Sequence, residues 1–179
     1  MAAGSGPVDA AVALAYLTDA ALPAIASLLD VRRFRLEAAS LCERGAALAV
    51  EASDVTRWAE LTVSRVEYMC DVHDWTGGRA VASSFLEDAA SSAGVPAGRV
   101  ARMLHQCGRI DAAMDRPVDA CLALFDRALE LSSGDADGAG QVQRDKVAAL
   151  CRRGPCDAAR SIVAAMGSAV DESLASVRA

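Results

Sequence analysis

Two cysteines and two histidines are spaced so that they could bind a metal ion. Cys70 and His73 form a C-x-x-H pair, and His105 and Cys107 follow further along the chain. Four such ligands suit a structural zinc ion, but the spacing between the two pairs fits no common zinc finger. Cys70 and Cys107 also match apolar helical positions, and His73 falls at a predicted helix C-terminus, where a partly charged imidazole is favoured. We therefore expect packing and capping roles and no metal site.

Cys151 and Cys156 flank a short basic turn near a predicted helix start. A thiolate at that position could be activated by the helix dipole and by Arg152 or Arg153, which would make a redox switch. The alternative, which we favour, is that small apolar side chains fill the turn. The six cysteines of the chain form no close-set disulfide framework. We therefore expect reduced thiols and a cytoplasmic protein.

Other motifs that signal catalysis are missing from the sequence. It has no glycine-rich phosphate loop, no G-x-S-x-G nucleophile motif and no Asp-rich metal motif. We predict that the protein is not an enzyme and needs no cofactor. A small helical enzyme or small-molecule-binding domain is an alternative, and it would require a closed pocket lined by polar groups.

Polar side chains form stripes along three predicted helices. Residues that recur every three or four positions share one face of a helix. In the helix over 54–72 this set is Arg57, Glu60, Ser64, Glu67 and Asp71. In the helix over 97–113 it is Arg99, Arg102, Gln106 and Arg109, with His105 beside them. The helix over 139–153 offers Gln141, Arg144, Lys146 and Arg152, less cleanly aligned.

The second and third stripes are basic, although the net charge of the chain is −6. A basic inner groove would bind an acidic peptide segment, a C-terminal carboxylate or another anionic ligand. Alternatively, the stripes are solvated outer faces that keep the helices soluble. The residues that we assign to partner binding are Arg99, Arg102, His105, Arg109, Glu60, Glu67 and Arg144.

The elements that must carry these stripes are helices. The chain has 179 residues, of which 53% are hydrophobic and only 4% aromatic, so its core must be built from small side chains. Apolar residues recur with helical periodicity and no stretch alternates as a strand would. After a disordered segment over 1–6, we expect a single domain over 7–179. Its helices are expected near 8–29, 31–51, 54–72, 77–92, 97–113, 117–131, 139–153 and 155–176, with a break near Gly167 in the last.

A pattern of small and larger apolar residues recurs at intervals of a little under 40 residues. It places a small residue first, a larger one four positions later and an alanine three positions after that. Its members are Ala82, Leu86 and Ala89, then Cys121, Phe125 and Ala128, then Ala158, Ile162 and Ala165. The small residues would let the second helix of a hairpin approach the first, and hairpins that cannot bury both faces alone would stack.

At these residues the chain resembles a tetratricopeptide repeat protein. The stretch "CLALFDRALELSSGD" is similar to the second helix and following loop of the repeats found in bacterial transcriptional regulators, including those of actinobacteria. Trp58 and Tyr68 are the nearest matches to the aromatic residues of the first helix, and we expect them to pack between helices. The resemblance extends over 54–168 and more weakly over 8–51. A plain helical bundle is the alternative.

The resemblance implies an all-α right-handed superhelix of about four antiparallel hairpins, near 8–51, 54–92, 97–131 and 139–176. In that family the first helices line a concave surface that holds a partner peptide or helix. We therefore predict a non-enzymatic protein-interaction module, a scaffold or regulatory protein. A ligand-sensing domain of a transcription-control system is the alternative. The acidic net charge argues against nucleic acid as a general partner.

Residues 8–29 are strongly apolar but contain Asp9, Asp19 and Pro23, and no basic segment precedes them. We therefore expect a buried helix and neither a signal peptide nor a membrane span. Terminal hairpins of a solenoid need a polar outer face, which this helix lacks. We predict a homodimer through this end of the molecule.

Overall fold

The computed structural model describes residues 10–21, 32–92, 94–132, 134–153 and 156–177, and within them it contains helices and no strand. This confirms the predicted all-α class. The helices are α1 (Ala10–Tyr16), the π-helical η1 (Leu17–Ala21), α3 (Arg32–Glu51), α4 (Val55–Asp71), α5 (Trp75–Ser91), α6 (Ala97–Ala113), α7 (Val118–Leu131), α8 (Ala136–Arg153) and α9 (Cys156–Val177). The predicted disordered segment over 1–6 lies outside the described residues, as do residues 8–9 and 22–29 of the helix predicted over 8–29.

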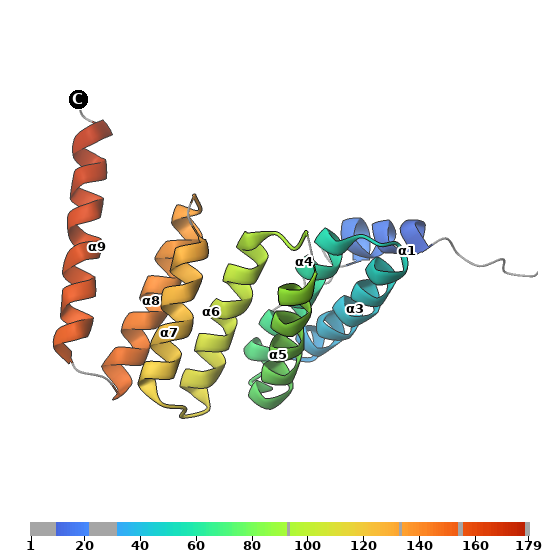
Figure 1. Ribbon diagram of the computed structural model, residues 1–179, viewed down its shortest axis with the longest axis horizontal. Helices are drawn as coiled ribbons and strands as arrows, with labels where there is room; N and C mark the ends of the chain where they lie inside the picture. Colours follow the sequence, from blue (N-terminus) through green and yellow to red (C-terminus); the bar gives the residue numbers. More distant parts are fainter. Residues whose placement is uncertain (1–9, 22–31, 93, 133, 154–155, 178–179) are drawn as a thin grey trace, which may run out of the picture.

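The helices follow one another along the long axis of the molecule in chain order, from α1 at one end to α9 at the other (Figure 1). From α3 to α9, each helix packs against the next one in sequence. In addition, α6 packs against both α4 and α8. Side chains of α4, α6 and α8 can therefore meet, although another helix separates each pair in the sequence.

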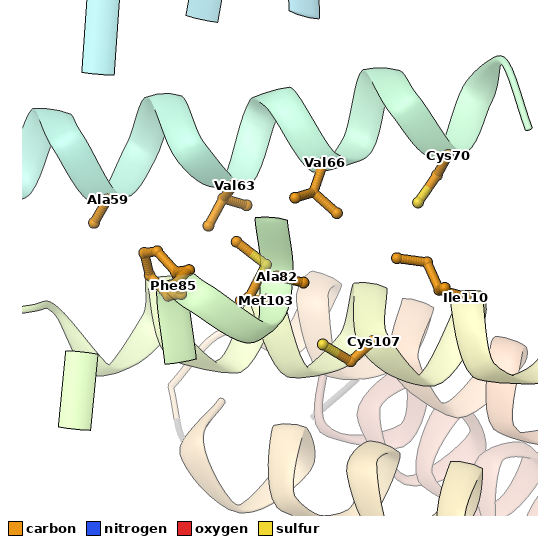
Figure 2. Packing of buried hydrophobic residues seen from close by; sticks show 9 residues of the cluster. All are labelled: Ala59, Val63, Val66, Cys70, Ala82, Phe85, Met103, Cys107 and Ile110. Atoms are coloured by element: carbon orange, nitrogen blue, oxygen red, sulfur yellow. The ribbon is translucent and has the colours of Figure 1, made fainter. Parts of the chain in front are cut away.

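The largest core cluster lies where α4, α5 and α6 meet. Apolar residues at steps of three and four on α4 point toward the other two helices (Figure 2). The cluster comprises Ala59, Val63, Val66, Cys70, Ala82, Phe85, Met103, Cys107 and Ile110. Burial of a side chain such as Phe85 or Ile110 contributes about 2 to 3 kcal/mol of hydrophobic stabilisation. This cluster fixes the backbone of α4 and α6, and thereby the polar stripes on their other faces.

Two smaller clusters continue the core in both directions. One joins α6, α7 and α8 and comprises Leu104, Cys121, Phe125, Ala128, Val142 and Ala149. The other joins α1, η1, α3 and α4 and comprises Leu14, Leu17, Cys42, Ala49 and Leu61. Leu86 packs against both the α4–α5–α6 cluster and the α6–α7–α8 cluster. Trp58 packs against both the α4–α5–α6 cluster and the cluster of α1, η1, α3 and α4. The core is therefore continuous along the row of helices.

The recurring apolar pattern coincides with buried positions in α5 and α7. Ala82, Cys121, Phe125 and Ala128 are all buried. In α5, however, the fully buried large residue is Phe85, while Leu86 is half-buried and packs against the core cluster of α6, α7 and α8.

Aspartate caps set the beginnings of α4 and α5. The Asp54 Oδ1 accepts a hydrogen bond from the backbone N–H of Arg57 at 3.0 Å and so caps the N-terminus of α4. The Asp74 Oδ1 accepts from the N–H of Gly77 at 3.0 Å, so α5 begins at Trp75 and not at 77 as predicted. Gly77 and Gly78 both lie in the first turn of the helix, because the cap outweighs their low helix propensity.

An aspartate cap also sets the beginning of α8. The helix predicted over 139–153 begins earlier, at Ala136, because the Asp135 Oδ1 accepts from the N–H of Gly138 at 2.9 Å. At the far end of the chain, α9 runs through Gly167 without the predicted break. Both differences arise because glycine in a helix interior costs only about 1 kcal/mol, which local capping and neighbouring turns can offset.

Candidate binding groove

A groove of about 600 Å³ extends over α4, α6 and α8. Its base is formed by buried residues of α6 and α8, among them Ala101, His105, Gln106 and Val142. Its walls carry charged and polar side chains. These are Arg35, Glu67, Tyr68, Asp71, Arg102, Arg109, Ser132, Asp135, Gln141 and Asp145, together with Gly98 and Gly138.

The stripes on α4 and α6 face each other across one side of the groove. The Arg102 Nη2 donates to both carboxylate oxygens of Glu67, at 2.6 and 2.8 Å. Beyond the groove lining, a second pair joins the same two helices, in which the Arg99 Nη2 donates to the Glu60 Oε1 at 3.1 Å. These pairs are partly exposed, so each adds little to stability, about 1 kcal/mol or less. Their main effect is to neutralise the two arginines.

Asp145 of α8 meets α6 across the other side of the groove. Its Oδ2 lies 2.8 Å from the His105 Nε2 and 3.6 Å from the Arg109 Nε. Burial raises the pKa of Asp145, but the hydrogen bond and charge of His105 and the charge of Arg109 act more strongly together, so the pKa lies below its usual value. Asp145 is therefore an ionised carboxylate that holds two α6 side chains in place.

The rim of the groove nearest α3 is formed by Arg35, Tyr68 and Asp71. The Arg35 guanidinium contacts the Asp71 carboxylate at 2.6 Å and lies 5.7 Å from the centroid of the Tyr68 ring. Burial raises the pKa of the Tyr68 phenol. Its hydroxyl group is therefore protonated at neutral pH and can donate a hydrogen bond into the groove.

The groove carries charges of both signs. Its lining holds three arginines and four carboxylates, and each arginine forms an ion pair with one of the carboxylates. The basic inner groove considered from the stripes of α6 and α8 does not describe this lining, because carboxylates of α4 and α8 pair with its arginines.

Four of the seven residues assigned to partner binding from the sequence line the groove, namely Glu67, Arg102, His105 and Arg109. Glu60 and Arg99 form their ion pair beyond the lining. Arg144 lies on an exposed part of α8, where its Nη2 donates to the Gln141 Oε1 at 2.6 Å.

Sequence reasoning missed Asp145 and Asp135, and it treated Tyr68 only as a packing residue. Tyr68 does pack against the core cluster of α1, α3 and α4, but it also lines the groove. Asp145 lies four positions after Gln141, which places both on one face of α8. That spacing places Asp145 in the polar stripe of this helix, although the stripe was described only by its glutamine and its basic residues.

The two cysteines and two histidines do not gather at one site, although Cys70 and Cys107 belong to the same core cluster. Cys70 and Cys107 are buried, and burial raises the pKa of their thiols to about 12 and about 11. His73 is exposed beside Trp75, while His105 pairs with Asp145. Within the described residues, no group of three or more His, Cys, Asp or Glu side chains is placed to hold a metal ion. Cys151 is a free, exposed thiol, and the side chain of Cys156 lies outside the described part.

None of the described helices combines the length and the apolar character that crossing a membrane requires. Comparison of the chain with protein-family models, with curated proteins and with solved structures gave no match.

Proposed function

We propose that the protein is a non-enzymatic interaction module that binds a segment of another protein in the groove over α4, α6 and α8. The observation that carries this proposal is the groove itself. It extends over three helices, holds about 600 Å³ and presents charges of both signs. A groove of this size accommodates several side chains of a peptide or helix.

We further infer that the helices form a stack of hairpins similar to tetratricopeptide repeats, with α4, α6 and α8 as the first helices of successive hairpins. The packing of α6 against both α4 and α8 supports this inference, as does the packing of each helix on the next. In such a stack each hairpin contacts mainly its neighbours, and the first helices form one continuous surface. The groove lies on that surface.

The paired charges indicate what kind of segment the groove would bind. A purely acidic segment would meet Glu67, Asp71 and Asp145 as well as the arginines, so like-charge repulsion would offset the attraction. A segment with both signs of charge can match both sets. The Tyr68 hydroxyl and the Gln141 side chain add polar groups that can bind a peptide backbone.

A pull-down from native cell lysate with quantitative mass spectrometry tests the proposal. The groove variant is Glu67→Ala/Arg102→Ala, which removes an acid and a base together and leaves the net charge unchanged. The matched control is Arg127→Ala/Glu130→Ala, because that exposed pair on α7 lies outside the groove lining. Both variants should remain folded, since exposed pairs contribute little to stability.

We expect a protein captured by the wild type and by the control to be lost with the groove variant, and to bind the wild type directly in calorimetry. Equal capture by both variants would contradict the proposal. If the wild type captures nothing specific, the proposal also fails, and the ligand-sensing alternative becomes the one to test by a thermal-shift screen of small molecules.

A further inference from the structure

A second pocket, of about 370 Å³, lies at the opposite end of α4 from the groove. Three helix ends meet there, namely the C-terminal ends of α3 and α5 and the N-terminal end of α4. Its lining is Ala49, Val50, Ser53, Asp54, Val55, Trp58, Asp88 and Ser92. Trp58 and Glu67 are separated by roughly 14 Å along the axis of α4, so the two sites do not share residues.

One part of this pocket is apolar and rigid. Trp58 lines it, and its ring stacks on buried Phe85 with a centroid distance of 5.0 Å. Val50 and Val55 lie beside it and are 63% and 36% exposed. A tryptophan that is already held in place loses little freedom when a ligand packs on it, so it is suited to anchor one.

The other part of the pocket is negatively charged. Asp54 already caps α4 and lies 3.7 Å from the Arg57 guanidinium. The Asp88 carboxylate has no hydrogen bond or ion pair to the part of the chain that the structure describes, although its backbone carbonyl accepts from Ser92. The C-terminal ends of α3 and α5 add the negative ends of two helix dipoles, against one positive end at the N-terminus of α4, which the Asp54 carboxylate caps. The balance of charge at this position therefore favours a cation.

We propose that this pocket binds a basic peptide segment in which an arginine or lysine stands beside a large apolar residue. The apolar residue packs on Trp58 and Val55, and the alkyl stem of the basic residue lies along the same surface. Its cationic group approaches Asp88 and the indole ring, both of which attract a positive charge. Within the described part of the chain, the free Asp88 carboxylate distinguishes this pocket from the groove, where every arginine and most carboxylates are already paired.

Titration of the ¹⁵N-labelled protein with a peptide probe, followed by NMR spectra, tests this proposal directly. The probe is acetyl-Leu-Arg-amide, and its matched neutral control is acetyl-Leu-citrulline-amide, which has nearly the same shape without the charge. The chain has two tryptophans, so the indole N–H of Trp58 reports on the pocket and that of Trp75 is an internal control. A Trp75→Phe variant assigns the two signals.

We expect the arginine probe to shift the Trp58 signal saturably and to leave Trp75 unchanged. Loss of one charged contact should weaken binding about tenfold, both for the citrulline probe and for Asp88→Asn. Glu87→Gln, an exposed neighbour outside the pocket lining, should bind as the wild type does. If Asp88→Asn fails to fold, the arginine and citrulline probes on the wild type decide the question.

Three outcomes would overturn the proposal. A Trp58 signal that does not respond up to the solubility limit of the probe would show that there is no such site. Equal binding of the two probes would show that the negative charge has no role. A Trp58 signal that moves with protein concentration alone would show that a second copy of the chain occupies the pocket.

Discussion

The ring of Phe125 on α7 lies directly against Gly108 on α6. A Cβ atom added at position 108 would be 2.6 Å from the Cε1 of that ring, closer than real Cβ contacts come. Both residues are buried, so neither can move aside into solvent. The missing side chain at 108 is therefore what allows α6 and α7 to pack with Phe125 between them.

Gly108→Ala should destabilise the protein. The extra methyl group overpacks the contact with Phe125, and we expect a loss of about 1 to 3 kcal/mol in the free energy of unfolding, despite the better helix propensity of alanine. Chemical denaturation measures it. Gly98→Ala in the first turn of α6 is the control, because a Cβ there meets nothing within 4 Å. Equal stability of the two variants would refute the packing argument.

The stability of the protein should fall in acid in part through Asp145. Burial raises the pKa of Asp145, but His105 and Arg109 lower it by more, so the native pKa lies below that of the unfolded chain. Its contribution is therefore complete above about pH 4 and is lost as the pH falls through the native pKa. Asp145→Asn should cost about 1 to 2 kcal/mol at pH 7 and progressively less in acid.

Denaturation curves from pH 7 to pH 3 check this expectation. Asp157→Asn is a suitable control, because its pair with Arg160 is almost fully exposed and should contribute little at any pH. A wild-type and an Asp145→Asn curve that stay parallel through the acid range would show that the pairing of Asp145 does not stabilise the fold.

The N-cap of α5 should contribute measurably to the free energy of unfolding of the protein. Asp74→Ala removes the acceptor for the Gly77 N–H, and we expect a loss of about 1 kcal/mol. Asp74→Asn keeps an acceptor at the same position and should remain within a few tenths of a kcal/mol of the wild type. Thermal unfolding distinguishes the two. If alanine and asparagine behave alike, the cap does not determine where α5 begins.

The buried thiols should be unreactive in the native protein. Burial raises the pKa of Cys42 and Cys70 to about 12 and of Cys107 to about 11. At pH 8 fewer than about one in a thousand of these groups is the nucleophilic thiolate. In a Cys156→Ser background, Ellman's reagent should therefore titrate one fast thiol, and Cys151→Ser should abolish it. Fast labelling of a second thiol in the native state would show that the core opens readily.

The homodimer predicted from the apolar N-terminal segment has a defined surface to test. Leu14 and Leu17 are buried, while Val12 and Tyr16 on the same short segment are 62% and 70% exposed. If a second copy covers this surface, light scattering should give twice the mass of one chain at micromolar concentration, and Val12→Lys/Tyr16→Lys should halve it. Val163→Lys on exposed α9 is the control. A monomeric wild type would refute the prediction.

Helix positions could be predicted well because each depends on local signals. The apolar period of α4 and the cap at Asp54 are both present in a few neighbouring residues, and the boundaries follow from them. The starts of α5 and α8 were predicted two and three residues too late. An aspartate that caps the helix was present in both cases, and it is the stronger signal.

The groove could be predicted only in part, for a different reason. Periodicity placed Arg102 and Arg109 on one face of α6, and they do share one side of the structure. Their partners Glu67 and Asp145 lie 35 and 36 positions away in the sequence. Which acids would meet which arginines depends on how α4, α6 and α8 approach one another, and no local pattern contains that information.

The order of the helices along the molecule also has a consequence for how the chain folds. In the described part, each helix packs only on helices one or two places away in sequence. Contacts of such short sequence separation close small loops at little entropic cost, so helical proteins of this kind fold in milliseconds or less. A chain emerging from the ribosome could pack α3 on α4 before α8 has been made, and the groove would be complete only once α8 has packed on α6.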